Sequence, residues 1–324
     1  HEIRCLCRPS SNTAYLQKLP VKIVTGDLRE PLSLEKALGG CEILYHVAAD
    51  YRLWAKNPQE LIDSNVKGTK NILNAARKAD VRKVVYTSSV SAVGRTEPGG
   101  PVTHYGGLSG AERAEWEKQF SGNETMTPTE HQLIGPYKKS KFLAEQAARG
   151  FAQQGMDIVI VNPSTPVCSH DIKPTPTGKL VLDFLNRKMP AYLDTGLNLV
   201  DVEDVAAGHL LAAEKGKSGE RYILGNKNLM LKEILDILSR ITGLPAPKFK
   251  VPYALAYTAG WFSTAFAELT GIQPAIPLDG VKMAREIMFY DGSKAVKELS
   301  LPQTPVEKAL EKAVRFFKDS GYVR

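Results

Sequence analysis

A tyrosine and a lysine four residues apart, Tyr137 and Lys141, have the clearest capacity for chemistry in this chain. The sequence around them predicts the first turns of a helix, where side chains at i and i+4 leave the same face one turn apart. A phenol has an ordinary pKa of about 10, and a neighbouring cation favours its anion. A phenol poised in this way can exchange a proton with an alcohol or carbonyl oxygen, which is the chemistry of making or breaking a C–OH group.

Short motifs of polar or small residues directly follow several runs of β-branched residues. They are Gly26-Asp27-Leu28, His46-Val47-Ala48-Ala49, Thr87-Ser88-Ser89 and Asn162-Pro163-Ser164. In a doubly wound parallel sheet the ligand binds beyond the carboxyl ends of the strands, so motifs at these ends meet at one edge. The sequence therefore predicts a ligand site that these motifs share with Tyr137.

The elements that must position these residues alternate between short β-branched runs and longer amphipathic segments. We predict strands at Glu2–Cys7, Lys22–Thr25, Ile43–Val47, Lys83–Thr87 and Asp157–Val161, and helices at Leu32–Leu38, Pro58–Ala79, about Ala111–Phe120, and from Tyr137 through Phe151. Asn57 is placed to cap the helix at Pro58, with Glu60 at the third helical position as in a capping box. This alternation predicts an α/β fold with a doubly wound parallel sheet.

The pattern changes from about Pro174 to short mixed segments separated by Pro and Gly. In this half, Leu199–Val205 begins a helix with a polar cap, and Arg221–Leu224 indicates a short strand. We therefore divide the chain into residues 1–173, which hold the main sheet, and residues 174–324. The second part is mainly a smaller substrate-covering lobe, with returns to the main sheet.

The composition, 43% hydrophobic and 24% charged in 324 residues, is that of an ordinary globular protein. The formal charge is +7, but Lys and Arg are scattered, which argues against a nucleic-acid partner. The excess favours anionic small ligands, or is only a solvated surface. The cysteines form no C-x-x-C pair and lie at no zinc spacing, so we predict no metal site and a reducing, cytoplasmic location.

The longest uncharged run, Val251–Ala267, is at the short limit for a membrane span. It contains Tyr, Thr, Ser, Gly and Trp, so we expect no integral membrane span and interpret it as a packed helix. A surface-lying helix is the alternative, in which residues near Tyr253–Phe266 serve a lipid-like substrate or a membrane surface.

The motifs, in their order along the chain, resemble those of the extended short-chain dehydrogenase/reductase family. The chain looks most like its hopanoid-associated sugar epimerases and dihydroflavonol-4-reductase-like enzymes. The resemblance is carried by Gly26-Asp27-Leu28, His46-Val47-Ala48-Ala49, Asn65-Val66-Lys67-Gly68-Thr69, Thr87-Ser88-Ser89 with Gly94, and Tyr137-x-x-x-Lys141. It implies a Rossmann-like fold in which residues 1–173 bind a dinucleotide.

The resemblance also implies a role for each residue of the site. Tyr137 is expected to be the general acid/base, Lys141 to lower its pKa and hold the nicotinamide ribose, and Ser89 to hydrogen-bond the reacting oxygen. The other expected cofactor contacts are Asp27, Leu28, Val47, Ala48, Ala49, Asn65, Thr87, Ser88, Val161, Pro163 and Ser164. A core Asn bonded to backbone is the alternative for Asn65, a turn or cap serine the alternative for Ser89, and we expect no catalytic role for His46.

The choice of cofactor depends on the end of the first strand. An acidic residue there binds the ribose hydroxyls of NAD, whereas a cation accommodates the extra phosphate of NADP. This strand ends at Cys7-Arg8, so we expect Arg8 to favour NADP(H), with NAD(H) and a plain surface arginine as alternatives. Substrate contacts are expected from Ser89, Asn162 and Tyr192. Asp171, Lys173 and Asp201 are further candidates by their place in the chain alone.

The family pattern begins with a strand and a glycine-rich turn that approaches the pyrophosphate. This chain begins at His1 inside what corresponds to the second strand, so we expect the first βα unit, on the order of 25 residues, to be absent. A truncated chain of this kind would bind dinucleotide poorly. A polar stretch with Pro98–Pro101 and Gly106-Gly107 lies between Gly94 and Tyr137, and we interpret it as a substrate lid or a passive rim insertion.

Three functions fit these observations. The first is an NAD(P)-dependent oxidoreductase acting at a secondary alcohol or ketone, and the second is a nucleotide-sugar epimerase that retains NAD. The third is a non-catalytic dinucleotide-binding protein. In each case the expected partner is a small molecule, and a homodimer is among the expected assemblies.

Overall fold

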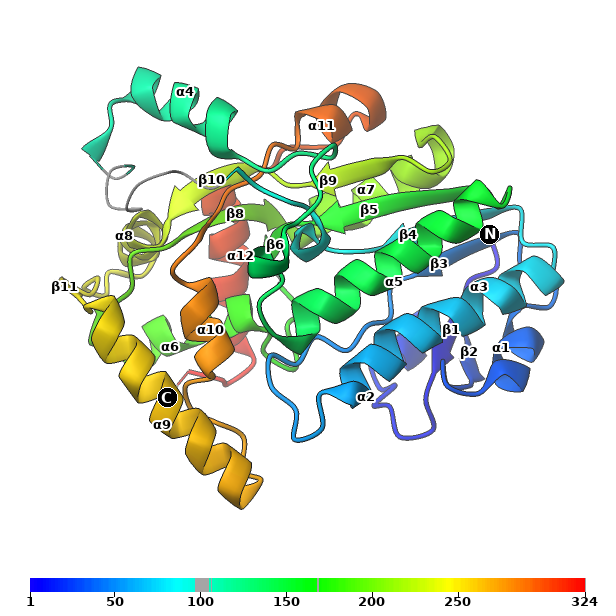
Figure 1. Cartoon of the computed structure of the whole chain (residues 1–324), viewed down its shortest axis with the longest axis horizontal. Helices are drawn as coiled ribbons and strands as arrows, with labels where there is room; N and C mark the ends of the chain where they lie inside the picture. The colour runs from blue at the N-terminus through cyan, green and yellow to red at the C-terminus, as the bar shows by residue number, and fades with distance from the viewer. Residues whose placement is uncertain (97–104, 106, 168, 324) are drawn as a thin grey trace.

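The computed structural model describes residues 1–96, 105, 107–167 and 169–323. Its central layer is a parallel sheet in the order β3–β4–β5–β9 (Figure 1). The strands are β3 (Ile43–His46), β4 (Lys83–Thr87), β5 (Ile158–Pro163) and β9 (Arg221–Leu224). Because β5 is buried along nearly its whole length, its sequence is an almost continuous apolar run, as expected for a strand with both faces covered.

Alternate residues of β5 point to opposite faces of the sheet. Ile158 and Ile160 pack into a core with α1, α3 and α5, whereas Val159 and Val161 pack into another core with α7 and α11. These helices are α1 (Pro31–Leu38), α3 (Gly68–Lys78), α5 (Gly135–Gln153), α7 (Val202–Lys215) and α11 (Ser293–Leu299). Helices on both faces make the sheet doubly wound, which confirms the predicted fold class.

Strands β1 (Arg4–Cys7) and β2 (Lys22–Thr25), with η1 (Leu16–Lys18) between them, form a separate parallel pair. Arg4 lies opposite Lys22 in this pair, and Cys7 lies opposite Thr25. The five strands predicted in the first half are therefore present, but they are divided between this pair and the main sheet. The expectation that a βα unit is absent before His1 stays a prediction.

The predicted helix at Pro58–Ala79 is interrupted in the structure. It consists of α2 (Gln59–Ile62), a π-helical turn η2 (Asp63–Lys67) and α3. The Asn57 Oδ1 accepts from the Gln59 amide at 3.1 Å, but Pro58 is the cap residue of α2 and Glu60 pairs with Arg52, so the predicted capping box is not formed. A π-helical turn adds a residue to the turn and is frequent at functional sites, and here it carries Asn65.

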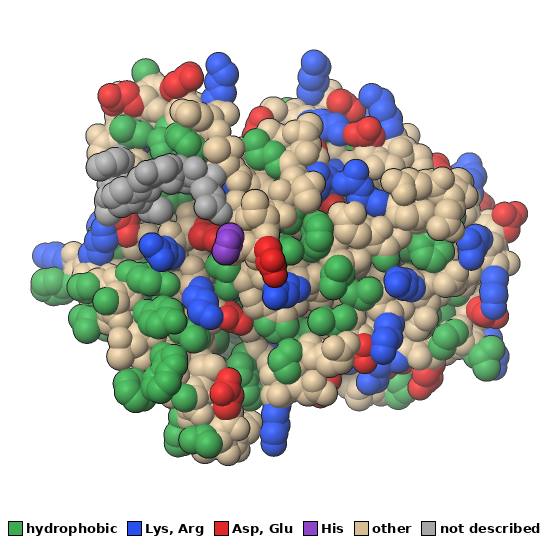
Figure 2. All heavy atoms as spheres, in the orientation of Figure 1, with side chains coloured by type: hydrophobic (Ala, Val, Ile, Leu, Met, Phe, Trp, Pro, Cys, Tyr) green, Lys and Arg blue, Asp and Glu red, His purple; other side chains and the backbone are tan. Residues whose placement is uncertain are grey.

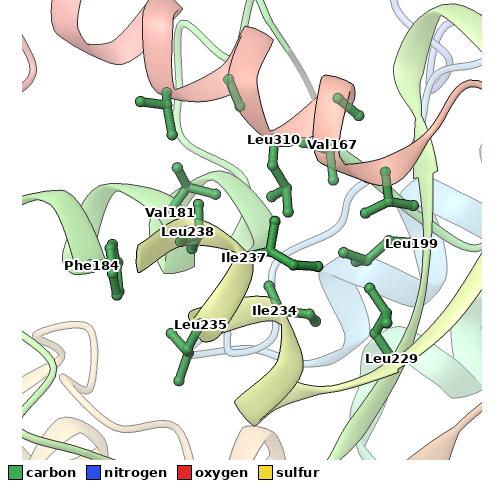
Figure 3. Packing of buried hydrophobic residues seen from close by; sticks show 14 of the residues in the cluster. Val167, Val181, Phe184, Leu199, Leu229, Ile234, Leu235, Ile237, Leu238 and Leu310 are labelled. Carbon is green, nitrogen blue, oxygen red and sulfur yellow. The ribbon is translucent and has the colours of Figure 1, made fainter. Parts of the chain in front are cut away.

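A second core fills the lobe built mostly from the later half of the chain (Figure 3). Leu199 and Leu229 from the sheet meet Ile234 and Leu238 from α8, with Leu310 of α12 above them. The elements here are β6 (Thr165–Val167), β8 (Gly196–Asp201), β10 (Lys227–Met230), β12 (Ile287–Met288), α6 (Pro176–Leu185), α8 (Leu231–Thr242) and α12 (Val306–Asp319), with the pair β7 (Ala191–Tyr192) and β11 (Phe249–Lys250). The division at residue 173 stays a prediction, although β9 and α7 do join the main sheet.

Between β4 and the helix of Tyr137, the described residues include η3 (Val90–Ala92), α4 (Gly110–Phe120) and η5 (Glu130–Gln132). The helix expected near Ala111–Phe120 is present and begins with a capping box between Ser109 and Glu112. Pro98–Pro101 and Gly106 of the expected lid lie outside the described residues, so the lid stays a prediction.

Helix α9 (Tyr253–Thr270) runs along the edge of the molecule beside α10 (Leu278–Met283), at the lower left of Figure 1. Gly260 and Ala267 are its only buried residues, so the interpretation as a packed helix is wrong. Small side chains occupy the face of α9 that contacts the protein, and its large apolar side chains are exposed to solvent. No helix among the described residues is long and apolar enough to cross a membrane.

Candidate active site

Tyr137 lies in the first turn of α5, which begins with a sharp turn of the chain. Gly135 has φ +74°, a left-handed conformation that favours glycine, and Pro136 follows at the start of the helix. A Cβ on Gly135 would stand 2.6 Å from Oδ2 of Asp279, at the start of α10. Gly135 therefore lets the chain turn tightly against α10 immediately before Tyr137.

The phenol of Tyr137 lies beside two serine hydroxyls. Interaction with the Ser89 and Ser91 hydroxyls favours the phenolate. Burial acts in the opposite direction and is the larger effect, so the pKa of Tyr137 is raised above its ordinary value. The described residues thus keep this phenol protonated, in the form that gives up a proton to a reacting oxygen.

Lys141 lies one turn further along α5 and is also buried. Its Nζ donates to the Thr87 carbonyl at 2.9 Å and lies 5.6 Å from the centre of the Tyr86 ring. Burial lowers the pKa of Lys141 to about 8, against the opposing effect of the Glu145 carboxylate. The ammonium thus points to the end of β4, and the expectation that Lys141 lowers the pKa of Tyr137 stays a prediction.

Ser89 serves as a cap residue and also contacts the phenol. Its Oγ accepts from the Ser91 amide at 3.1 Å, which caps η3, and donates to the Ser91 hydroxyl at 3.2 Å. The cap fixes the Ser89 hydroxyl where it meets Tyr137. The structure thus shows the cap serine that the sequence left as an alternative, and contact of Ser89 with the reacting oxygen stays a prediction.

A buried polar network beneath Ser89 was missed by the sequence analysis. The Asn162 amide donates to the Ser89 carbonyl at 3.0 Å and to the Glu145 carboxylate at 2.7 Å, and Glu145 pairs with Arg221 at 3.3 Å. Glu145 could have been found, because it lies four residues after Lys141 on the same helix face. The network anchors the loop that carries Ser89 to α5 and β9.

Asn65 joins the end of β3 to the catalytic helix. Its Oδ1 accepts from the Asp50 amide at 2.7 Å, and its Nδ2 donates to the Asp50 carbonyl and the Ser140 hydroxyl, both at 2.9 Å. Ser140 in turn donates to the Tyr137 carbonyl at 2.8 Å. The structure thus shows the buried, backbone-bonded asparagine that the sequence left as an alternative.

The edge expected to hold the cofactor combines exposed small residues with unpartnered hydroxyls. Val47, Ala48 and Ala49 are exposed directly after β3. Among the described residues, Ser88 Oγ and Ser164 Oγ are buried without a hydrogen-bond partner. Small side chains leave room for a ligand, and buried hydroxyls without partners are suited to bind one, so this edge fits a dinucleotide.

Other expected cofactor contacts are already engaged within the protein. Thr87 Oγ1 lies 2.8 Å from Nε2 of His209, and Val161 is fully buried in the sheet core. Pro163, in contrast, is partly exposed. Nε2 of His46 lies 3.2 Å from Thr69 Oγ1, and burial lowers the pKa of His46 to about 3. His46 is therefore a neutral core histidine.

Asp27 and Arg8 lie close enough to interact at the ends of β1 and β2. Hydrogen bonds from Arg29 are the main cause that lowers the pKa of Asp27 to about 2, and the Arg8 charge contributes. Burial raises the pKa of Asp50, after β3, but hydrogen bonds from Arg52 outweigh it and lower the pKa, with a contribution from the exposed Arg8. Gly68, the first residue of α3, lies against Leu28. A Cβ added at Gly68 would stand 3.0 Å from the Cβ of Leu28, so the glycine lets α3 come close to the loop after β2.

The expected substrate residues do not form one surface. Asn162 is fully buried and bonded to Ser89, so it positions that loop instead of lining a substrate wall. Tyr192 packs against the second core, Asp171 accepts from Thr175 near the start of α6, and Asp201 caps α7. Their places in the chain gave no information on these contacts.

A cluster of charged residues lies next to Tyr137 in sequence and was not predicted. Lys138 is buried, and burial with the nearby Arg95 charge lowers its pKa to about 8. Its Nζ lies 3.5 Å from Glu286, which also pairs with Arg95. This cluster ties the first turn of α5 to the segment after α10.

The described surface also carries an open cleft of about 560 Å³ between α4 and α11. Lys118, Asn228, Asp291 and Lys297 are among its lining residues. None of the predicted catalytic residues lines this cleft. The candidate site is therefore defined by the strand ends and the first turns of α5.

Comparison with known proteins shows similarity along the whole chain. A protein of Synechocystis sp. provisionally named dihydroflavonol 4-reductase is 50% identical over 328 residues, covering 100% of this chain and 90% of that protein. Sterol demethylase protein B of Methylococcus capsulatus is 31% identical over 324 residues, covering 99% of this chain and 92% of that protein. The crystal structure of a nucleoside-diphosphate-sugar epimerase from Pseudomonas aeruginosa is 25% identical with a TM-score of 0.76, covering 100% of this chain and 91% of that one.

The family model of the NAD dependent epimerase/dehydratase family matches residues 1–225. The match includes all the motifs at the ends of the main-sheet strands and the helix that carries Tyr137. It confirms the resemblance, the Rossmann-like fold, and an enzyme of the class that acts on CH–OH groups. The chain belongs to the NAD dependent epimerase/dehydratase family.

Proposed function

We propose that the protein is an NADP(H)-preferring oxidoreductase that interconverts a secondary alcohol and a ketone, with Tyr137 as the acid/base. The observation that carries this proposal is the Tyr137 phenol next to the Ser89 and Ser91 hydroxyls, with Lys141 buried one turn away on the same helix. The similarity to a protein provisionally named as a reductase supports this direction of chemistry.

In the proposed reduction, the carbonyl oxygen of the substrate lies against Tyr137 Oη and Ser89 Oγ. The nicotinamide, when bound, supplies a hydride to the carbonyl carbon. Tyr137 gives its proton to the oxygen as negative charge develops there, and Ser89 supplies a second hydrogen bond. The buried Lys141 ammonium stabilises the phenolate that is left, and oxidation of the alcohol follows the same steps in reverse.

The residues proposed to hold the cofactor lie on the same edge of the sheet. Val47–Ala49 would lie along it, the Ser88 and Ser164 hydroxyls would gain partners, and Lys141 would hold the nicotinamide ribose. Arg8 is exposed and its charge acts on Asp27 and Asp50, and in this proposal its guanidinium would pair with the extra phosphate of NADP. Asn65 supports the edge through the Asp50 backbone.

The function is tested by replacing Tyr137 with Phe, with Tyr15→Phe as control. Tyr15 is exposed and far from the site in sequence, so its replacement should leave turnover unchanged. We expect Y137F to lower kcat by a factor of about 100 or more, because the general acid is lost, while the Kd for NADPH stays within the error of the wild type. The measurement is NADPH oxidation with a panel of ketones. Unchanged turnover in Y137F would contradict the catalytic assignment and favour the non-catalytic alternative.

A nucleotide-sugar epimerase remains the second candidate, because the chain is similar to a structure of that class. Such an enzyme oxidises and re-reduces one carbon with a cofactor that stays bound. Mass spectrometry of the cofactor released from the purified protein separates the two functions. Stoichiometric NAD would support the epimerase, whereas freely exchanged NADP(H) would support the oxidoreductase.

A further inference from the structure

Helix α9 presents a stripe of large apolar side chains to solvent. The α9 stripe consists of Leu255, Trp261, Phe262, Phe266 and Leu269, which are 64%, 51%, 64%, 59% and 88% exposed. Leu255, Phe262, Phe266 and Leu269 are spaced by seven, four and three residues, which places them on one face of the helix. A contiguous apolar surface of this kind marks an interaction site.

The opposite face of α9 fastens the helix to the protein. Gly260 and Ala267 are buried there, Ser263 Oγ accepts from the Ile276 amide at 3.1 Å, and Thr264 Oγ1 accepts from the Leu278 amide at 3.0 Å. Small and hydroxyl-bearing residues thus face the body of the protein. The large hydrophobic side chains face solvent, whereas in an ordinary amphipathic surface helix they face the protein core.

Cationic side chains flank both ends of the stripe. Lys248 precedes α9 and Arg285 lies 5.5 Å over the Tyr253 ring, while Lys56 Nζ stands 3.6 Å from the position of a Cβ on Gly271, at the other end. All three cations are exposed and have no carboxylate partner among the residues that the structure describes, and Glu268 is the one acidic residue within the helix. Hydrophobic side chains gather at the lower left of Figure 2, where α9 lies, with blue side chains beside them.

We propose that the α9 stripe docks onto the surface of an anionic lipid bilayer. The helix would lie in the plane of the interface, with Phe262 and Phe266 below the headgroups and the flanking cations against lipid phosphates. Trp261 and Tyr257 on its flank are residue types that favour this interface. Docking is peripheral, since no described helix could span the bilayer.

A second copy of this chain fits the same surface less well. Joining two α9 stripes would bring Lys56, Lys248 and Arg285 of one copy toward the same cations of the other. Like charges placed together at the rim of an interface oppose association. An anionic lipid surface instead offers opposite charge to all three.

The test is binding of the full chain to vesicles of phosphatidylcholine with and without phosphatidylglycerol, measured by flotation and by tryptophan fluorescence. We expect binding to the anionic vesicles, weakened by raised salt, with a blue shift of the emission that is lost in W261F. The double variant F262Q/F266Q should bind more than about tenfold more weakly, because two buried phenyl rings are removed. K56Q/K248Q should lose the preference for anionic lipid.

The matched control is L32Q/L210Q, which replaces two exposed leucines of α1 and α7 by the same residue. This control should bind vesicles as the wild type does. Failure of the wild type to bind anionic vesicles, or equal binding by F262Q/F266Q, would overturn the proposal. It would also be overturned if the wild type formed dimers in sedimentation that F262Q/F266Q abolished, without any vesicle binding. All these readouts are independent of catalytic turnover.

Discussion

The surroundings of the Tyr137 phenol depend on buried side chains behind it. Ser89 is held by its own cap and by the Asn162 amide, and Asn162 is held by Glu145. A buried carboxylate is stable only when it is paired, and Arg221 supplies the charge. Asn65 acts in the same way on the opposite side, through Ser140. The orientation of Tyr137 is therefore set by a network of buried hydrogen bonds.

Replacement of Glu145 by Gln tests this network. The variant keeps a hydrogen-bond acceptor for Asn162 but leaves Arg221 buried without its carboxylate, so we expect the free energy of unfolding to fall by about 3–5 kcal/mol. Burial lowers the pKa of Lys141 to about 8, and the Glu145 carboxylate opposes this effect. Without the carboxylate, the pKa of Lys141 should fall further. Activity that requires the Lys141 ammonium should then be lost at lower pH than in the wild type, since the ammonium deprotonates as pH rises through its pKa.

The measurements are urea unfolding and the pH profile of kcat/KM for E145Q. Glu42→Gln, at an exposed position paired only at the surface, is the control and should change neither. A pH profile identical to that of the wild type would show that Glu145 has no electrostatic effect on Lys141.

Regular elements were predictable because their sequence patterns are local. β2 and β4 begin and end where their β-branched runs indicated, and α5 carries Tyr137 as expected. The π-helical turn at Asp63–Lys67 was not predictable, since a single extra residue leaves the apolar pattern on either side intact. The exposure of α9 was missed for a related reason, because hydrophobicity alone does not indicate which partner covers a helix face.

The turn before α5 gives a prediction at the level of this element. Gly135→Ala should lower the free energy of unfolding by about 1–3 kcal/mol, because a left-handed residue gains a Cβ that meets the Asp279 carboxylate. It should also lower kcat, because Tyr137 follows two residues later. Urea unfolding and turnover are the measurements.

Gly150→Ala is the matched control within the same helix. A Cβ there meets nothing within 4 Å, so this change should raise stability by about 0.5–1 kcal/mol. Equal effects of the two substitutions would contradict the role assigned to the Gly135 turn.

The main sheet has a hydrophobic core on each face and the lobe from the later half of the chain has another, and the chain passes repeatedly between these parts. The face of β4 and β5 that carries Val85 and Val159 is covered by α7 and α11, which come from the later half of the chain. The candidate site residues at the strand ends were predictable from the first half of the chain alone, because each belongs to a local motif. Contacts such as Arg221 with Glu145, 76 residues apart, depend on the assembled fold and leave no local signal.

Residues 1–173 alone should therefore fail to form a stable folded unit. Without β9, α7 and α11, the apolar face at Val159 and Val161 is exposed to water. We expect this piece to bind a hydrophobic dye and to unfold without a cooperative transition, whereas the full chain unfolds cooperatively and binds little dye. A cooperative transition of residues 1–173 would show that the division at residue 173 separates independent domains.

The contacts at the start of α5 have a consequence for the timing of biosynthesis. Tyr137 and its strand-end partners are translated first, yet Lys138 pairs with Glu286, 148 residues later, and Gly135 packs against Asp279. A chain emerging from the ribosome therefore holds Tyr137 well before it holds the residues that fix the first turn of α5. The contacts around this turn are completed only near the end of translation, when the segment with Asp279 and Glu286 packs against it.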